Sequence, residues 1–449
     1  MQNLDLSKIK KIFFVGIGGI GISAIARMMV LEGKEVIGSD ITENEMTDEL
    51  RELGIKIFLG QKIELIPKDA DLIVYSIAIP RYDPNFFEKL KNLGVSMLTY
   101  PQMLGLVTKD KHTIAVSGTH GKTTVTAMIA KILIDTRKDP SVIVGSLLKD
   151  SKSNLIVGKS EYFVVEACEY ERSFLNVKPK IAVITNIETD HLDYYKDLAD
   201  IQNAFSEFIS QTKDMVIYNS KNINISLLVG EFKGKLVDYS KYLNKVPKLS
   251  VPGEHNRMNG AAALAVADVL GIDEDDAQKS LAGFLGTWRR LEKKGETKDG
   301  TIIYDDYAHH PTEIRASLQA LCELYPKNSK KITVIFQPHL YSRTKALFDG
   351  FSKAFKEADL VILLPIYFAR EKLDETVSSG KLAEVICKNG DKAIAFTDFE
   401  LATEYLRSQV WGGNDIFVTM GAGEAYKIAD LLFKYKLDKT ISETAPSGT

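Results

Sequence analysis

A glycine-rich stretch at residues 117–124 carries the residue types that bind phosphate. It reads SGTHGKTT, so that two residues separate Gly118 from Gly121 before a lysine and two threonines. Glycines let backbone N–H groups approach an anion, a lysine adds positive charge, and a hydroxyl can bind Mg²⁺ beside the phosphates. The pattern predicts a shortened phosphate-binding loop rather than a plain turn between a strand and a helix. The loop residues are Gly118, Thr119, His120, Gly121, Lys122, Thr123 and Thr124.

Two further side chains are expected near this loop. Glu166 ends the apolar run EYFVVEA, and His191 follows the apolar run KIAVITN. The carboxyl ends of parallel strands meet at one edge of a sheet, so Thr123, Glu166 and His191 could converge there. Such a set suits Mg²⁺ bound with ATP. Taken singly, Glu166 could be a solvated acid at a strand end and His191 a surface histidine.

A second glycine motif opens the chain. Gly16, Gly18 and Gly21 lie in GIGGIGIS, and Asp40 comes 19 residues after Gly21. This spacing is typical of a nucleotide bound at a helix N-terminus, with the acid near a ribose hydroxyl. The motif alone leaves a redox cofactor, another nucleotide and a purely structural turn open.

Polar residues also cluster late in the sequence. His255, Asn256 and Asn259 precede an alanine-rich helix and could read a base or cap the helix. Arg289 and Arg290 could grip phosphate or carboxylate, or could be solvated. The ends of the predicted strands carry side chains that could contact a substrate. His309 and His310 are adjacent, and adjacent side chains of a strand point to opposite faces, so these two histidines would not bind the same metal ion. The candidates for substrate contact are Asp305, Asp306, His309, His310, His339, Arg343 and Arg370.

The elements that must position these groups alternate between short apolar runs and helical patterns throughout the chain. This alternation predicts an α/β fold with parallel sheets. A chain of 449 residues exceeds what one core serves, which favours two or three domains. We expect three: a Rossmann-like domain at residues 1–106, a P-loop ATPase-type parallel sheet at 107–286, and a Rossmann-like domain at 287–449.

Composition narrows the functional classes. Apolar residues make up 45% of the chain, charged residues 26%, and the net charge is -3, which argues against a nucleic-acid partner. The three cysteines show no metal-binding spacing and suit a reducing compartment. No segment approaches the roughly 20 apolar residues of a membrane span. These features predict a cytoplasmic protein that does not enter a membrane.

The motifs together resemble those of the Mur ligases of peptidoglycan synthesis. The matching segments are GIGGIGIS, SGTHGKTT, TNIETDHLDYY, PGEHNRMN, DDYAHHPTEI, FQPHLYSRT and MGAG. The resemblance implies a UDP-sugar domain, a central ATPase domain and a C-terminal domain that closes over ATP and brings an amino acid. Within the family, it implies an ATP-dependent amide ligase that joins L-alanine to the carboxylate of UDP-N-acetylmuramate through an acyl phosphate. It also favours a sugar nucleotide over NAD at the first glycine motif.

The resemblance assigns roles residue by residue. It implies catalytic roles for Lys122, Glu166, His191 and Arg343, and Mg²⁺ binding by Thr123, Glu166 and His191. ATP contacts are implied for the loop residues and for His255, Asn256, Asn259, Arg290 and Asp305, with Asp306 as an alternative to Asp305. Substrate contacts are implied for Gly18, Gly19, Gly21, Asp40, Ser76, Tyr307, His309, His339 and Arg343.

Two positions depart from the family pattern. Leu340 stands where the family commonly carries arginine, which leaves Arg343 as the chief candidate for the alanine carboxylate. Glu166 begins the segment EACEYERSFL, whereas the family usually carries a more acidic run at this place. The resemblance therefore assigns no firm role to Glu169.

Three other functions remain open at this stage. They are a related ligase that recycles a muramyl tripeptide, a nicotinamide-dependent oxidoreductase, and a UDP-sugar-binding protein without turnover. The sequence leaves the oligomeric state, monomer or homodimer, open.

Overall fold

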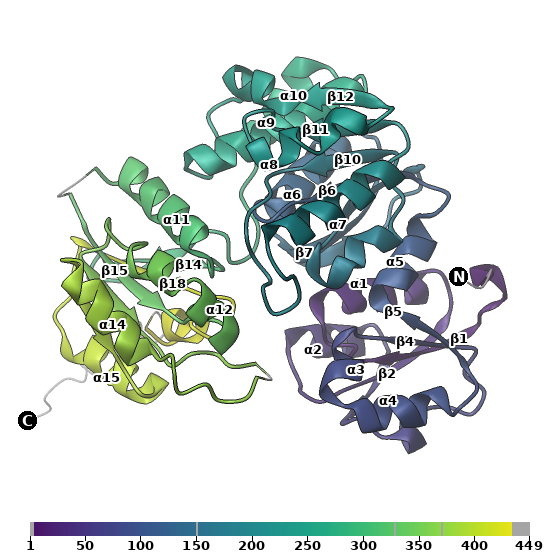
Figure 1. The fold of residues 1–449 in the computed structure, drawn as a ribbon, viewed down its shortest axis with the longest axis horizontal. Coiled ribbons are helices and arrows are strands. Elements are labelled where there is room, and N and C mark those ends of the chain that lie inside the picture. Colours follow the sequence, from purple (N-terminus) through teal and green to yellow (C-terminus); the bar gives the residue numbers. More distant parts are fainter. Residues whose placement is uncertain (1–3, 150, 327–328, 370, 433–449) are drawn as a thin grey trace, which may run out of the picture. The chain divides into compact units, whose positions relative to one another are not determined.

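The computed structural model describes residues 4–149, 151–326, 329–369 and 371–432. Arg370 and the polar stretch 438–449, whose composition predicts disorder, lie outside the described residues. The chain forms two compact units. The first unit contains the residues up to Glu188, Leu198–Pro247 and Asn259–Ala282, and the second contains Thr189–Asp197, Lys248–Met258 and the residues from Gly283 onward. Figure 1 shows the three sheets of these units.

The first sheet is a parallel sheet with the order β3-β2-β1-β4-β5. Its central strand β1 is buried along Ile12–Val15, as expected for a strand covered on both faces. The strands are β1 (Lys11–Val15), β2 (Glu35–Asp40), β3 (Lys56–Leu59), β4 (Leu72–Tyr75) and β5 (Ser96–Thr99). The helices are α1 (Ile20–Leu31), α2 (Glu45–Glu52), α3 (Ala78–Tyr82), α4 (Pro84–Lys91) and α5 (Tyr100–Thr108).

The second sheet has the order β12-β11-β10-β6-β9-β7-β8. Among the described strands, all run parallel except β8, which is antiparallel to its neighbour β7. The strands are β6 (His112–Ser117), β7 (Ser141–Leu148), β8 (Ser153–Ile156), β9 (Tyr162–Glu166), β10 (Ile181–Ile184), β11 (Met215–Tyr218) and β12 (Lys235–Asp238). The helices are α6 (Lys122–Asp135), α7 (Leu198–Gln211), α8 (Ile223–Ser226), α9 (Glu254–Val269) and α10 (Glu274–Ala282).

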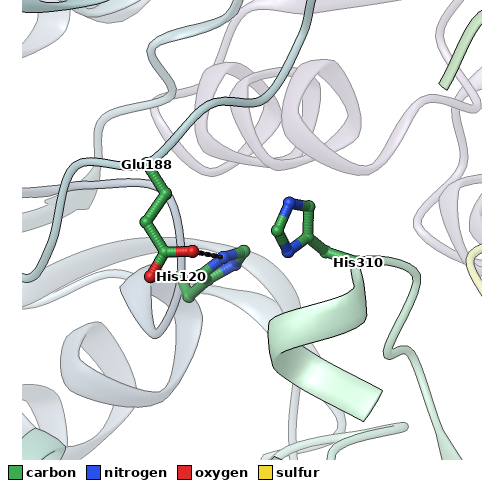
Figure 2. Close-up of side chains that lie close together, drawn as sticks. All are labelled: His120, Glu188 and His310. Atoms are coloured by element: carbon green, nitrogen blue, oxygen red, sulfur yellow. Dashed lines mark ion pairs between the residues drawn. The ribbon is translucent and has the colours of Figure 1, made fainter. Parts of the chain in front are cut away.

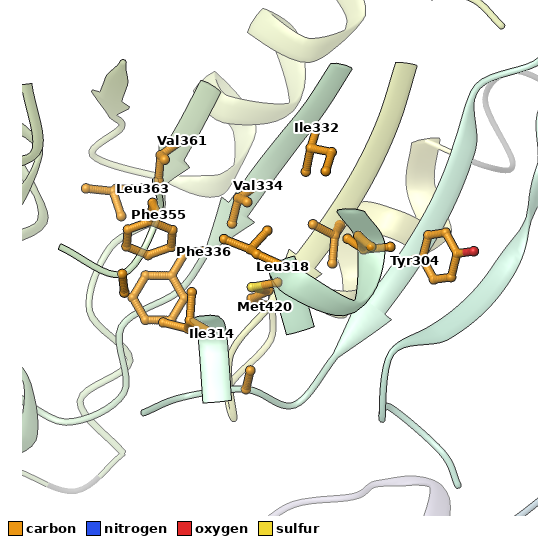
Figure 3. Close-up of a cluster of buried hydrophobic side chains, with 14 of the residues drawn as sticks. Tyr304, Ile314, Leu318, Ile332, Val334, Phe336, Phe355, Val361, Leu363 and Met420 are labelled. Carbon is orange, nitrogen blue, oxygen red and sulfur yellow. The ribbon is translucent and has the colours of Figure 1, made fainter. Parts of the chain in front are cut away.

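The third sheet has the order β13-β14-β18-β15-β16-β17, with only β13 antiparallel to its neighbour among the described strands. Figure 3 shows its core, in which Ile314 and Leu318 of α11 lie with Val334 and Phe336 of β15. The strands are β13 (Glu292–Glu296), β14 (Ile302–Asp306), β15 (Lys331–Phe336), β16 (Leu360–Leu363), β17 (Ala393–Ala395) and β18 (Asp415–Met420). The helices are α11 (Pro311–Leu324), α12 (Tyr341–Ala346), α13 (Phe348–Ser352), α14 (Ser379–Lys388) and α15 (Phe399–Ser408).

Short 3₁₀ helices complete the secondary structure. They are Leu6–Lys8, Ile63–Leu65, Tyr170–Asn176, Val229–Glu231 and Tyr239–Lys245. No helix in the described part of the chain has both the length and the apolar character needed to cross a membrane.

The first two sheets share one compact unit because polar and close backbone contacts join them. Asn154 of β8 is fully buried and donates to Ser23 Oγ of α1 at 2.9 Å. A Cβ on Gly105 of α5 would lie 2.2 Å from the carbonyl oxygen of Asn176. The predicted α/β fold is confirmed. The predicted boundary at residue 106 falls inside α5, so the chain passes from the first sheet to the second between β5 and β6.

Candidate active site

The phosphate-binding loop connects β6 to α6, as the sequence predicts. Its two glycines adopt backbone conformations that other residues rarely adopt, with φ of 132° at Gly118 and 84° at Gly121. A Cβ on Gly118 would lie 2.1 Å from Thr185 Oγ1, and one on Gly121 would lie 2.6 Å from Asn259 Oδ1. Both the backbone conformation and the lack of space therefore require glycine here.

The segment that follows β10 braces the loop. The N–H of Thr119 donates to the carbonyl of Asn186 at 2.9 Å, and the N–H of His120 donates to Asn186 Oδ1 at 2.9 Å. Thr185 Oγ1 donates to the His120 carbonyl at 2.6 Å, and the N–H of Glu188 donates to Thr119 Oγ1 at 2.8 Å. Figure 2 shows the Glu188 carboxylate directed at the His120 ring, 3.5 Å from Nε2. These contacts hold the backbone of the loop in place.

Lys122 points back over the loop. Its Nζ donates to the carbonyls of Gly118 at 2.6 Å and Thr119 at 3.1 Å, and to Glu169 Oε1 at 3.0 Å. Burial would lower the pKa of Lys122, but the Glu169 carboxylate, with Cys168 and Glu166 nearby, raises it above its ordinary value. Lys122 is therefore a fixed cation within the loop.

Thr123 and Glu166 lie in direct contact. Thr123 Oγ1 donates to Glu166 Oε1 at 3.0 Å, and the N–H of Gly145 in β7 donates to Glu166 Oε2 at 2.7 Å. A hydroxyl and a carboxylate beside a phosphate loop are hard oxygen donors, and this donor set fits Mg²⁺. His191 belongs to the second unit, so its expected convergence with this pair remains a prediction.

The first glycine motif lies at the carboxyl edge of the first sheet. The N–H of Gly18 donates to Asp40 Oδ2 at 2.8 Å, so Asp40 engages the glycine turn itself. A Cβ on Gly16 would lie 3.1 Å from Ser76 Cβ, which places Ser76 beside the same turn. Gly19 is the N-cap of α1.

Gly21 serves close packing in this structure. A Cβ at this position would lie 2.6 Å from the ring of Tyr100 in α5, so that only glycine lets the two helices approach. The turn brings Gly18, Gly19, Asp40 and Ser76 together, whereas Gly21 lies against a protein ring.

A buried ion pair organises the second unit around Arg343. Asp190 Oδ1 accepts from Arg343 Nε at 3.1 Å and lies 3.1 Å from a second guanidinium nitrogen. A third guanidinium nitrogen lies 3.2 Å from His339 Nδ1. Burial would raise the pKa of Asp190, but His191 and Arg343 hold it well below its usual range. A cavity of about 80 Å³ adjoins the pair, lined by residues 189–193 and by Ser342, Arg343, Ala346 and Leu347.

His309 lies in a second cluster of the same unit. Its Nδ1 lies 2.9 Å from the Tyr307 carbonyl, and its backbone N–H donates to Glu313 Oε2 at 3.0 Å. Arg290 lies 3.8 Å from Glu313 Oε1, and its guanidinium is 5.2 Å from the centre of the Tyr307 ring. The ring centres of His309 and His339 are 6.2 Å apart. The predicted residues Tyr307, His309, Arg290 and His339 therefore lie near one another.

Asp305 has protein partners for its carboxylate. It accepts from Arg289 Nε at 2.8 Å and from Thr419 Oγ1 at 2.6 Å, and its side chain is 1% exposed. Arg289 also donates to the Gly421 carbonyl at 2.7 Å, which ties β14 to the loop after β18. This geometry gives Asp305 a structural part in addition to the expected contact with ATP.

Asp306, the alternative to Asp305, is also buried. It accepts from the N–H groups of Leu291 at 3.1 Å and Ala308 at 2.8 Å, and from Ser317 Oγ at 2.7 Å. Burial raises its pKa to about 6 despite these hydrogen bonds.

The residues expected at the nucleotide base are divided between the units. Asn259 lies beside Gly121 in the first unit. His255 and Asn256 lie in the second, where Asn256 Nδ2 donates to the Pro252 carbonyl at 2.7 Å. Asn256 lies in the first turn of α9, and this contact is not an N-cap because the side-chain amide donates to a carbonyl instead of accepting from a helix N–H. Contact of these residues with a nucleotide base remains a prediction.

Two half-buried histidines should make the second unit sensitive to acid. Burial lowers the pKa of His255 and His309 to about 4, although Glu313 opposes the shift. The unfolded chain binds these protons with pKa near 6.5, so the free energy of unfolding should fall as pH drops from about 6.5 toward 4. Urea unfolding followed by the fluorescence of Trp288 and Trp411, both in this unit, measures the effect. His255→Gln should reduce the slope against pH, and an unchanged slope would contradict this assignment.

Three acids have partners in the structure that sequence reasoning did not assign to them. Glu169 pairs with Lys122, Asp190 pairs with Arg343, and Glu313 contacts both His309 and Arg290. Asp190 and Glu313 stand beside the predicted residues His191 and His309 in the motifs TDH and HHPTE. Their place within these motifs was the sequence signal that could have identified them. The partner of each acid was harder to predict, because Arg343 is distant from Asp190 in sequence and His309 lies four residues before Glu313.

Comparisons with known proteins agree along nearly the whole chain. Residues 11–112 match the model of the Mur ligase family catalytic domain, residues 116–246 the Mur ligase middle domain, and residues 289–423 the Mur ligase glutamate ligase domain. UDP-N-acetylmuramate--L-alanine ligase of Clostridium acetobutylicum is 40% identical, with 95% of this chain and 98% of that protein aligned. The protein of the same name from Acetivibrio thermocellus is 41% identical, over 96% and 97% of the two chains.

Solved structures show the same architecture. The UDP-N-acetylmuramate-alanine ligase of Thermotoga maritima has a TM-score of 0.78 at 28% identity, covering 97% of this chain and 100% of that one. A murein peptide ligase from Psychrobacter arcticus has a TM-score of 0.69 at 22% identity, over 96% and 99%, and supports the fold alone. With full-length relatives at 40% identity and three matched family domains, the chain belongs to the Mur ligase family.

Proposed function

We propose that this protein is an ATP-dependent ligase that joins L-alanine to the carboxylate of UDP-N-acetylmuramate in peptidoglycan precursor synthesis. The observation that carries the proposal is the identity of 40% with ligases of that name along nearly the full length of both chains. The phosphate loop supports it, because Lys122, Thr123 and Glu166 already lie together there. In an oxidoreductase, these three residues would have no expected role in binding or catalysis.

The loop performs the electrostatic part of the reaction. Its backbone N–H groups and Lys122 would hold the ATP phosphates, while Thr123 and Glu166 would hold Mg²⁺. When bound, Mg²⁺ would neutralise phosphate charge. These positive charges let an anionic carboxylate approach an anionic phosphoryl group, so catalysis consists of positioning and charge neutralisation.

The chemical steps transfer one phosphoryl group and then one acyl group. A carboxylate oxygen of UDP-N-acetylmuramate attacks the γ-phosphorus, the bond to the β-phosphate oxygen breaks, and ADP leaves. The alanine amine attacks the acyl carbon of the resulting acyl phosphate. The amine loses a proton, inorganic phosphate leaves, and an amide remains.

The second unit would bind the amino acid. We assign Tyr307, His309, His339 and Arg343 to this site, with His255, Asn256, Asn259, Arg290 and Asp305 toward the nucleotide. Because the Arg343 guanidinium is held by Asp190, an incoming carboxylate would bind to an already oriented cation. His191 would complete the metal site.

The first sheet would bind the UDP-sugar around Gly18, Gly19, Asp40 and Ser76, and Gly21 would serve this site by allowing α1 to pack closely against Tyr100. We propose domain limits near residues 106 and 286, and a cytoplasmic location where ATP and the sugar nucleotide are available.

A related ligase that recycles a muramyl tripeptide is the second candidate, favoured by Leu340 at a position where the family commonly carries arginine. Phosphate release from ATP with UDP-N-acetylmuramate, measured against L-alanine, other amino acids and the tripeptide, separates the two. L-Alanine should give the highest kcat/KM. Activity with the tripeptide and none with alanine would overturn the choice, and nucleotide binding without turnover would indicate a non-enzymatic protein.

A further inference from the structure

Glu169 forms a buried ion pair with the lysine of the phosphate loop. Lys122 Nζ lies 3.0 Å from one carboxylate oxygen of Glu169 and 2.9 Å from the other. The side chains are 13% and 3% exposed, so water screens this pair only weakly. The negative charge of Glu169 is therefore fixed at the place where phosphates are expected.

Contacts with α3 and α7 hold the segment that directly follows Glu169. Tyr170 Oη accepts from Arg81 of α3 at 2.9 Å, and Arg172 donates to Asp200 of α7 at 2.6 Å. Phe174 stacks on Phe208 of the same helix, with ring centres 4.7 Å apart. Because its backbone is anchored in this way, Glu169 is poorly placed to withdraw when a ligand arrives.

A second carboxylate lies close by. Glu166 contacts Thr123, the residue directly after Lys122, and the negative charges of both Glu169 and Glu166 act on Lys122. Two carboxylates thus face one ammonium group at the loop. Such a site repels a metal-free triphosphate more strongly than a magnesium complex, whose charge is less negative and whose cation the carboxylates attract.

We propose that Glu169 is a specificity-determining residue that makes the loop select magnesium-bound nucleotide over metal-free nucleotide. The inference rests on the proposed function, since it concerns the site expected to bind ATP. Glu166 fits direct metal binding, whereas Glu169 acts through its charge and its hold on Lys122. Removing the charge of Glu169 should therefore change the preference for the metal complex while leaving a working phosphate loop.

The test is equilibrium titration of the full-length protein with ATP, once with excess Mg²⁺ and once with EDTA. Glu169→Gln should bind metal-free ATP about tenfold or more tightly than the wild type does. The ratio of the Kd measured with EDTA to the Kd measured with Mg²⁺ should therefore become smaller. Glu161→Gln is the matched control, because it removes the same charge at the exposed, opposite end of β9. The control should keep the wild-type ratio.

Circular dichroism shows whether Glu169→Gln folds. If it does not fold, a second variant tests the proposal. Glu169→Asp retains the charge and should retain the wild-type ratio, and a ratio reduced to near one would overturn the proposal. An unchanged ratio in a folded Glu169→Gln protein would overturn it as well. In either case, wild-type binding of magnesium-ATP would leave the proposed function intact, whereas a wild-type protein that binds no ATP would contradict the proposed function itself.

Discussion

Replacing Lys122 with alanine should lower kcat/KM for ATP by roughly a thousandfold. The ammonium group is held at the loop by two carbonyls and by Glu169, so its positive charge is fixed there, and it can exchange one of these hydrogen bonds for a phosphate oxygen. Water in the vacated space would not supply a fixed positive charge. Steady-state phosphate release with UDP-N-acetylmuramate and L-alanine measures the loss.

The same substitution should also destabilise the first unit. Without Lys122, the buried Glu169 carboxylate lacks its cation, and breaking a buried pair in this way costs about 3 kcal/mol. Adding Glu169→Gln to Lys122→Ala should recover most of this stability without recovering activity. Full activity of Lys122→Ala would contradict the assigned role, and a double variant no more stable than the single one would contradict the account of the ion pair.

Replacing Arg343 with leucine should have the second largest effect. The Asp190 carboxylate would stay buried beside the cavity without the guanidinium that pairs with it, which should lower the free energy of unfolding of the second unit by about 3–5 kcal/mol. If Arg343 also anchors the amino-acid carboxylate, kcat/KM for L-alanine should fall about a hundredfold or more. Tryptophan fluorescence in urea measures the first effect and phosphate release the second.

Arg315→Leu provides a matched control for this variant. Arg315 is exposed on α11 of the same unit, and its loss should change the unfolding free energy by less than about 0.5 kcal/mol. Equal stability of the two variants would show that the Asp190 pair contributes nothing. Normal use of alanine by a folded Arg343→Leu protein would remove Arg343 from the amino-acid site.

The parts of the fold that sequence predicts best are those set by local pattern. The loop from Gly118 to Thr123 was predicted because glycine conformation, strand and helix all depend on nearby residues. The contact between Thr123 and Glu166 followed from one rule, that parallel strands end at a common edge, and β6 and β9 are indeed neighbours.

The partners of charged groups were harder to predict, because they depend on strand order and register. Arg289 meets Asp305 through the antiparallel pairing of β13 with β14, which no spacing in the sequence reveals. Asp40 carries the expected position and residue type, yet its carboxylate accepts from the N–H of Gly18. A sequence motif can thus predict where a side chain lies without predicting which atom that side chain contacts.

The treatment of His309 and His310 as adjacent strand residues was wrong. Strand β14 ends at Asp306, whose side chain accepts from the N–H of Ala308 and turns the chain. His310 is instead the N-cap of α11, where its Nδ1 accepts from the N–H of Thr312 at 3.2 Å. The proline that follows His310 was the local signal for a helix start.

The central claim is that ATP activates the carboxylate of UDP-N-acetylmuramate at the Lys122 loop. The most direct measurement uses substrate labelled with ¹⁸O in that carboxylate, followed by mass spectrometry of the inorganic phosphate released in the presence of L-alanine. Because the acyl phosphate is cleaved at its acyl carbon, one ¹⁸O atom should appear in each phosphate. Phosphate without the label, released together with the amide product, would contradict the account.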